Sequence, residues 1–205
     1  MEDAAPGEDR IFTIPNAISI VRLCCVPLFL WLLFSEENRL AAAWLLAALG
    51  ATDWIDGYIA RHFNQVSQLG KVLDPVADRV LLIVGVVAIT IDGSVPLGVA
   101  ILSLTREGLV AIATVTLALM GARRIDVTWF GKAGTLFVMF AFPLFLLGHA
   151  DAGWWSDFGI WAGWACAITG IVFGYISLAL YVPLGRAALR DGRADRAAKA
   201  AEVPA

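Results

Sequence analysis

Six long apolar runs, separated by short polar segments, constrain this sequence more than any other feature. Hydrophobic residues make up 60% of the 205 residues and charged residues only 16%, whereas an ordinary soluble domain has roughly 25% charged residues. This composition excludes a soluble globular protein, a disordered chain and a disulfide scaffold. Because a helix needs about 20 mainly apolar residues to cross a bilayer, we expect an all-α, polytopic integral membrane protein with six transmembrane helices, near residues 17–34, 39–60, 76–91, 96–120, 131–148 and 158–183.

The basic residues predict how these helices are oriented. Of the 15 Lys and Arg residues, all except Arg39 and Arg106 fall in termini, loops and helix ends on one side of the arrangement. Positive charge collects on the cytoplasmic side, so we expect both termini to be cytoplasmic and the protein to span the cell membrane. We expect the chain to consist of three parts: a disordered acidic N-terminus at 1–10, a six-helix membrane domain at 11–185, and a charged cytoplasmic tail at 186–205. The tail is either a surface helix or loose. Nothing in the tail resembles a nucleic-acid-binding module.

Four aspartates lie close to the ends of two apolar runs. Asp53 and Asp56 are three residues apart at the cytoplasmic end of the second run, and Asp74 and Asp78 are four residues apart at the start of the third. Acidic side chains at membrane depth are costly and mark functional sites. Residues three or four apart share one helix face. A short loop makes the two helices antiparallel neighbours, so the two acidic faces can converge.

Four converging carboxylates need compensating positive charge. Their hard oxygen atoms favour two Mg²⁺ or Mn²⁺ ions, and metal pairs bridged by carboxylates serve displacement at phosphorus. Gly57 and Ala60 share a face with Asp53, Gly70 adds another bare backbone position, and Arg61 can bind a phosphate at the interface. A solvated set of interfacial acids and an ion- or proton-transport relay are the alternatives, although relays usually place their acids near the bilayer midplane.

At these residues the chain resembles the CDP-alcohol phosphatidyltransferases. The family signature, D-x2-D-G-x2-A-R-x8-G-x3-D-x3-D, is matched at every fixed position from Asp53 to Asp78. The segment from Pro15 to Arg22 resembles the P-N-x-x-[ST]-x-x-R opening of the first helix in these enzymes, although an ordinary Asn cap with an interfacial Arg would look the same. The six-span architecture extends the resemblance over nearly the whole chain.

The resemblance implies an integral membrane enzyme, commonly a homodimer, with its active site at the cytoplasmic membrane face. It implies transfer of a phosphatidyl group from CDP-diacylglycerol to an alcohol, with release of CMP. Carried over to this sequence, two divalent ions would be held by Asp53, Asp56, Asp74 and Asp78, and Asp78 would also be the catalytic general base. The cytidine diphosphate site is implied at Asn16, Asp53, Gly57, Ala60, Arg61 and Gly70.

The acceptor alcohol depends on basic residues further along the chain. Arg106 and Glu107 lie inside the fourth apolar run, where charge needs a partner or a water-filled cavity. They form either a mutually satisfied pair or part of an acceptor pocket. Family members with anionic acceptors carry a basic pocket near here, and the expected pocket consists of Arg106, Glu107, Arg123, Arg124 and Lys132. Such a pocket favours a phosphate-bearing acceptor over choline, ethanolamine or serine, and charge alone does not exclude inositol phosphate.

The run from Gly131 to Thr135 helps to separate two acceptors. It resembles the G-K-x-[KN]-T region shared by the phosphatidylglycerophosphate synthases and cardiolipin synthases of this family, and Gly134 stands where the former commonly have a second Lys. One cation fewer suits a phosphodiester better than a phosphomonoester. Phosphatidylglycerol, giving cardiolipin, is therefore the first candidate and glycerol 3-phosphate the second. On this interpretation, Gly134→Lys is expected to raise the use of glycerol 3-phosphate.

Two functions of other classes remain open from the residues alone. An ion-coupled transporter would move its substrate into sealed vesicles without releasing CMP. A non-catalytic membrane scaffold would keep every activity after replacement of the four aspartates.

Overall fold

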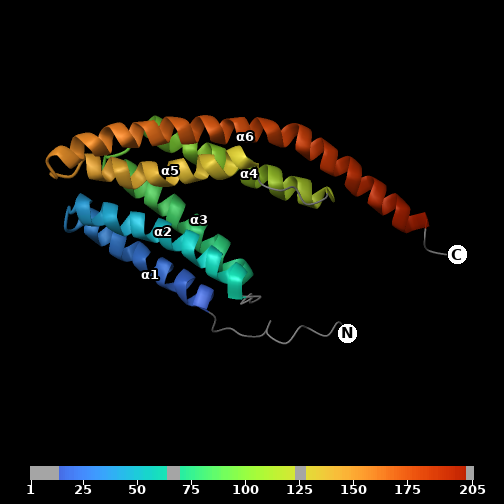
Figure 1. The fold of residues 1–205 in the computed structure, drawn as a ribbon, viewed down its shortest axis with the longest axis horizontal. Helices are drawn as coiled ribbons and strands as arrows, with labels where there is room; N and C mark the ends of the chain where they lie inside the picture. Colours follow the sequence, from blue (N-terminus) through green and yellow to red (C-terminus); the bar gives the residue numbers. More distant parts are fainter. Residues whose placement is uncertain (1–13, 64–69, 123–127, 202–205) are drawn as a thin grey trace. The chain divides into compact units, whose positions relative to one another are not determined.

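The structure is a computed structural model that describes residues 14–63, 70–122 and 128–201, with side chains described at 19–52, 79–122 and 128–192. All regular secondary structure in these ranges is α-helical (Figure 1). Each expected apolar run overlaps one helix, which confirms the all-α fold. The helices are α1 (Ile14–Phe34), α2 (Arg39–Phe63), α3 (Gly70–Ile91), α4 (Leu97–Leu119), α5 (Trp129–Gly148) and α6 (Trp154–Ala201).

Several of these helices have the length and composition of membrane helices. Within the described part of the chain, three segments have the length and apolar composition to cross one: Leu97–Leu119, Trp129–Gly148 and Trp154–Gly192. Shorter apolar segments are Ser19–Phe34, Arg39–Thr52 and Arg79–Ile91. Helices satisfy their own backbone hydrogen bonds in lipid, and helices of this kind belong to an integral membrane protein.

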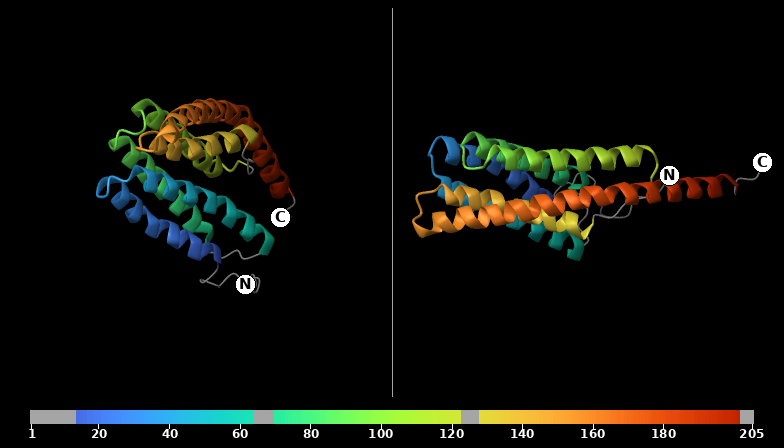
Figure 2. Two further views of the ribbon diagram at one scale, coloured as in Figure 1. Left: turned by 60° about the vertical axis from the view of Figure 1, so that its left-hand side comes forward. Right: turned by 90° about the horizontal axis from the view of Figure 1, so that it is seen from above.

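α6 is much longer than the apolar run within it. Its 48 residues continue as one helix through the charged tail (Figure 2). The residues from Gly185 to Ala201 are mainly Ala and Arg, which are strong helix formers. The described part of the tail is therefore helical rather than loose.

Local sequence patterns determine several helix ends. Asn38 precedes α2, and its Oδ1 accepts a hydrogen bond from the Ala41 N–H at 2.9 Å, which is the geometry of an N-cap. Gly93 follows α3 with a φ of 82°, and Gly121 follows α4 with a φ of 73°. Glycine adopts this left-handed conformation most readily. These residues end or begin helices where polar segments interrupt the apolar runs.

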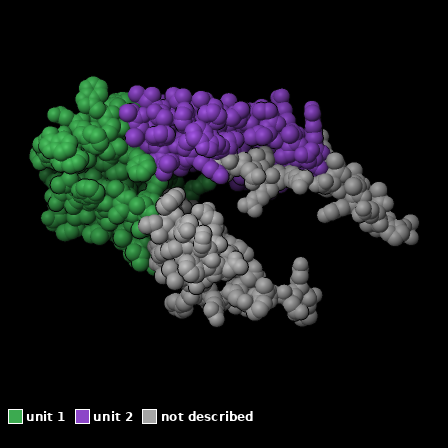
Figure 3. Space-filling view, viewed as in Figure 1, with its two compact units in different colours: residues 1–97, 139–164 green, residues 98–138, 165–205 purple. Residues whose placement is uncertain are grey.

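The chain divides into two compact units (Figure 3). Unit 1 comprises residues 1–97 and 139–164, and unit 2 comprises residues 98–138 and 165–205. In unit 1, α1 packs against both α2 and α3, and the side chains of Phe29, Leu33 and Ile89 are buried. Unit 2 contains α4, the first half of α5 and most of α6, and it holds the residues described below.

An ion pair joins two polar segments of unit 1. Arg39, the first residue of α2, donates from Nε to Oδ2 of Asp92 at 3.0 Å. Ser94 donates a hydrogen bond to the same oxygen, and the Asp92 side chain is only 7% exposed. Desolvation opposes ionisation of Asp92, but the hydrogen bonds from Arg39 and Ser94 and the charge of Arg39 outweigh it, so the pKa of Asp92 is lowered. The ion pair therefore ties the start of α2 to the residue that follows α3.

We predict that this ion pair makes the protein sensitive to acid. A carboxyl whose pKa is lower in the folded chain contributes its full stability above its unfolded pKa of about 3.9, and that contribution is lost as the pH falls through the folded pKa. Between about pH 5 and pH 2, the thermal unfolding midpoint in detergent should therefore fall less in Asp92→Asn than in the wild type. Thr114→Val, at an exposed position without a titratable group, should keep the wild-type pH dependence. Equal pH dependence in Asp92→Asn and the wild type would contradict the prediction.

Candidate functional site

The four aspartates of the expected metal site lie on two helices. α2 includes Asp53 and Asp56, and α3 includes Asp74 and Asp78, so each pair has the helical spacing that places it on one face. Their side chains lie outside the described ones, as do those of the other expected nucleotide-site residues, Asn16, Gly57, Ala60, Arg61 and Gly70. Among the side chains that the structure describes, no three His, Cys, Asp or Glu residues form a group that could hold a metal ion. The aspartate site therefore stays a prediction from the sequence.

The expected acceptor pocket is partly described. Arg106, Glu107 and Lys132 have described side chains, whereas Arg123 and Arg124 lie outside the described residues. Arg106 and Glu107 are adjacent on α4 and form an ion pair through Nη1 and Oε1. The structure therefore brings together the two charges that the fourth apolar run contains.

Arg106 also binds α5. Its Nη1 donates to Thr135 Oγ1 at 3.0 Å, and its Nη2 donates to the Gly131 carbonyl oxygen at 3.3 Å. The Thr135 hydroxyl donates to the same carbonyl oxygen at 3.0 Å. Arg106 is only 9% exposed, and a buried cation needs such partners. The two Nη groups of the guanidinium thus bind a carboxylate, a hydroxyl and a carbonyl, and they link α4 to the beginning of α5.

The other edge of Arg106 faces α6. A Cβ built on Gly174 would lie 3.0 Å from Arg106 Nε, so the glycine makes room for the arginine. A cavity of about 10 Å³ adjoins this contact and is lined by residues of α4, α5 and α6, including Ser103. Arg106 Nε and Ser103 Oγ are buried and have no hydrogen-bond partner among the described residues. The volume is near the minimum that one water molecule needs.

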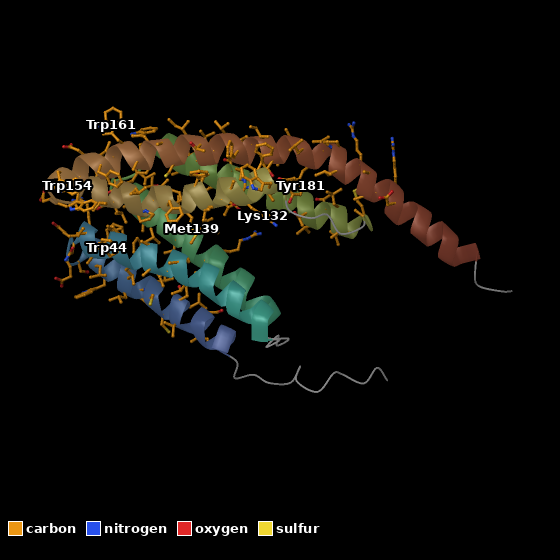
Figure 4. The ribbon with its side chains drawn as sticks, viewed as in Figure 1. Trp44, Lys132, Met139, Trp154, Trp161 and Tyr181 are labelled. Atoms are coloured by element: carbon orange, nitrogen blue, oxygen red, sulfur yellow. The ribbon has the colours of Figure 1, made fainter. Side chains whose placement is uncertain are left out.

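Thr128 caps the start of α5, and it was not among the residues predicted from the sequence. Its Oγ1 accepts a hydrogen bond from the Gly131 N–H at 3.1 Å, and it lies 2.6 Å from the Ser177 Oγ of α6. The Thr128 carbonyl accepts a hydrogen bond from the Lys132 N–H at 3.1 Å. A Thr directly before an apolar run is a recognised N-cap pattern, so the sequence contained the information. Lys132 is exposed on the turn that Thr128 caps (Figure 4).

Gly134 lies against the backbone of α6. A Cβ built there would be 2.8 Å from the Gly174 nitrogen and 3.0 Å from the Gly170 oxygen. Even a methyl group would require the two helices to separate. The expectation that Gly134→Lys adds a cation to the acceptor pocket is therefore wrong, because the position has no space for a side chain. The absence of a second lysine is a requirement of helix packing in unit 2.

Comparison with known proteins relates this geometry to a family. The CDP-alcohol phosphatidyltransferase family model matches residues 12–173. This chain belongs to the CDP-alcohol phosphatidyltransferase family. A cardiolipin synthase (CMP-forming) of Streptomyces coelicolor is 38% identical over 195 residues, which cover 93% of this chain and 89% of that relative. A CDP-diacylglycerol–glycerol-3-phosphate 3-phosphatidyltransferase of Rickettsia typhi is 35% identical over 169 residues, which cover 79% of this chain and 93% of that relative.

Membership of the CDP-alcohol phosphatidyltransferase family confirms the resemblance seen in the aspartate signature. The matched residues include all four aspartates and the run from Gly131 to Thr135. The chain is therefore an enzyme of phospholipid synthesis rather than a transporter or a scaffold. Membership implies CDP-diacylglycerol and a glycerol-type acceptor as substrates in a membrane, and phosphatidyltransferases of this family generally use divalent metal ions.

We predict that Gly134→Ala destabilises this phosphatidyltransferase, because the added methyl group must displace the backbone of α6. Overpacking of this kind typically costs about 1–3 kcal/mol. Gly108 in α4 is a matched control, since a Cβ built there has nothing within 4 Å, and Gly108→Ala should be neutral or stabilise the helix by up to about 1 kcal/mol. Thermal unfolding of both variants in one detergent tests this. Similar midpoints for the two variants would contradict the packing argument.

Proposed function

We propose that this chain is a cardiolipin synthase, which transfers the phosphatidyl group of CDP-diacylglycerol to phosphatidylglycerol and releases CMP. The observation that carries the proposal is the similarity to the cardiolipin synthase of S. coelicolor, which is 38% identical and aligns with 93% of this chain. The sequence also supports it, since Gly134 stands where the phosphatidylglycerophosphate synthases commonly have a second lysine. One cation fewer suits the single negative charge of a phosphodiester.

Synthesis of phosphatidylglycerophosphate is the second candidate. The relative from R. typhi supports it, because this chain covers 93% of that glycerol-3-phosphate 3-phosphatidyltransferase at 35% identity. Both reactions use the same donor and release CMP. They differ in the acceptor, which carries nearly two negative charges in glycerol 3-phosphate and one in phosphatidylglycerol.

In the proposed reaction, the aspartates carry the chemistry. Asp53, Asp56, Asp74 and Asp78 would hold two Mg²⁺ or Mn²⁺ ions, whose positive charge would stabilise the diphosphate and the departing CMP. The set of four carboxylates, paired on α2 and α3, fits such hard cations. Asp78 takes the proton of the acceptor hydroxyl as the hydroxyl oxygen bonds to the phosphatidyl phosphorus. The bond between that phosphorus and the bridging oxygen of CMP breaks as the new bond forms, and CMP leaves with that oxygen.

The donor nucleotide would bind beside these aspartates. Small residues leave room for the nucleotide near the backbone, and a guanidinium can bind two oxygens of one phosphate. The residues proposed for the cytidine diphosphate site are Asn16, Asp53, Gly57, Ala60, Arg61 and Gly70.

The acceptor's phosphate would bind at the start of α5. Lys132 offers an exposed cation on the first turn, and the Arg106–Glu107 pair supports that turn through the Gly131 carbonyl. Arg123 and Arg124 precede α5 in the chain and complete the proposed basic pocket.

The proposal includes the arrangement in the membrane. The distribution of Lys and Arg supports six spans, with both termini and the active site on the cytoplasmic side. The membrane domain would extend over 11–185, between an acidic segment at 1–10 and a charged tail at 186–205. We also propose that the enzyme is a homodimer, as is common in the family.

We predict that phosphatidylglycerol is the preferred acceptor. The purified protein in lipid, given CDP-diacylglycerol and one acceptor at a time, should form cardiolipin and CMP with phosphatidylglycerol and much less product with glycerol 3-phosphate. Mass spectrometry identifies the lipid product of each reaction. Abundant phosphatidylglycerophosphate without cardiolipin would establish the second candidate instead.

We predict that activity requires the aspartates and a divalent cation. EDTA should abolish CMP release, and added Mg²⁺ or Mn²⁺ should restore it, because the diphosphate's charge is otherwise uncompensated. Asp53→Asn, Asp56→Asn and Asp74→Asn should each lose metal binding and turnover, and Asp78→Asn should lower turnover far more than CDP-diacylglycerol affinity. Asp157→Asn is the control for an exposed aspartate. Full activity in EDTA would contradict the metal site.

A further inference from the structure

Two hydroxyl side chains that the proposed reaction does not use, Thr128 and Ser177, lie beside the turn that carries Lys132. We propose that they are positioning residues, which fix the first turn of α5 so that the Lys132 side chain leaves the helix in one direction, toward the acceptor's phosphate. This inference rests on the proposed function, because Lys132 belongs to the proposed acceptor pocket.

The peptide group between Gly131 and Lys132 is held at both ends. Its N–H, which belongs to Lys132, donates to the Thr128 carbonyl at 3.1 Å. Its carbonyl, which belongs to Gly131, accepts hydrogen bonds from Arg106 Nη2 at 3.3 Å and from the Thr135 hydroxyl at 3.0 Å. Because a peptide group is planar, bonds at both ends fix the orientation of the Lys132 backbone.

Thr128 is in turn held by α6. Its hydroxyl oxygen caps the Gly131 N–H at 3.1 Å and lies 2.6 Å from Ser177 Oγ. Ser177 is 0% exposed, so a hydroxyl lost from Thr128 is not replaced by bulk water and its buried partner is destabilised. Gly134, on the next turn of α5, contacts the backbone of α6. The beginning of α5 is thus fixed to α6 at two successive turns.

Aromatic packing supports the same turn. The ring of Phe130 lies 5.5 Å from that of Trp129 and 5.5 Å from that of Phe173 on α6, in both cases edge to face. Edge-to-face pairs are favourable beyond the area that they bury. Rotation of the first turn about the axis of α5 would therefore break apolar contacts as well as hydrogen bonds.

A lysine cation needs this support more than a shorter side chain does. The ammonium group stands at the end of a flexible four-carbon chain, and Lys132 is exposed, so its starting direction is set by its backbone. A cation whose backbone is oriented in advance binds the acceptor with a smaller ordering cost. Loosening the turn should therefore weaken acceptor binding and leave the donor, whose proposed site is on other helices, unaffected.

The test removes the Thr128 hydroxyl while keeping the shape of the side chain. Thr128→Val should raise the acceptor KM by up to about fivefold, which is the factor that corresponds to the free energy of a typical N-cap. The kcat and the Kd of CDP-diacylglycerol should stay near those of the wild type. Thr128→Ser should restore the wild-type acceptor KM. Thr114→Val is the matched control, because the exposed Thr114 hydroxyl donates to the Val110 carbonyl of its own helix at 2.8 Å and makes no hydrogen bond to another helix among the described residues.

A double-mutant cycle with Lys132→Ala shows whether Thr128 acts through Lys132. We expect Lys132→Ala to raise the acceptor KM and Thr128→Val to add nothing in that background. Additive effects, an unchanged acceptor KM in either single variant, or an equal rise in the Kd of CDP-diacylglycerol would overturn the inference. Ser177→Ala keeps the cap, should act in the same direction, and replaces Thr128→Val if that variant does not fold.

The assays use whichever of phosphatidylglycerol and glycerol 3-phosphate supports CMP release. Use of glycerol 3-phosphate would overturn the proposed acceptor, while the cycle would still test the positioning of Lys132 with that substrate. Failure of the proposed acceptor and failure of the positioning role of Thr128 therefore give different results.

Discussion

The close approach of α5 and α6 determines how unit 2 is built. The backbone of α6 at Gly170 and Gly174 occupies the space where a side chain of Gly134 would be. In lipid, helices gain little from hiding apolar surface, so their association depends on close packing at small residues. The same approach leaves space at Gly174 for Arg106 and brings the Ser177 hydroxyl to the start of α5. The Thr128–Ser177 contact depends on this spacing.

Two described arginines, Arg39 and Arg106, connect helices as well as pairing with an acid. Arg39 and Asp92 link the start of α2 to the residue after α3. Arg106 is neutralised by its neighbour Glu107, and its remaining hydrogen bonds reach α5. A charge in an apolar environment cannot be left without partners. The Arg39–Asp92 pair therefore restricts the separation of the two polar segments that it joins, and the hydrogen bonds of Arg106 restrict the separation of α4 and α5.

How far the sequence predicts this structure depends on the range of each interaction. Apolar length and the polar segments between runs predict the helices, because both act locally, and the aspartate spacing predicts the family for the same reason. The Thr128 cap is also local and could have been recognised before an apolar run. Its partner Ser177 is 49 residues away, and no local pattern contains it. From the sequence, Gly134 was interpreted as the absence of a second lysine. Its packing role depends on the backbone of α6 at Gly170 and Gly174, which no local pattern around Gly134 contains.

The length of α6 has an electrostatic consequence for its C-terminal end. Its 48 residues extend about 72 Å at 1.5 Å per residue, whereas a bilayer with its headgroups is about 40–45 Å thick. The helix is therefore longer than a bilayer is thick, and the partial negative charge of its macrodipole lies at the end beyond the apolar run. Arg193, Arg196 and Lys199 occupy the last turns of α6, where positive residues offset that partial charge. The tail thus carries its own counter-charge for the C-terminal end of α6.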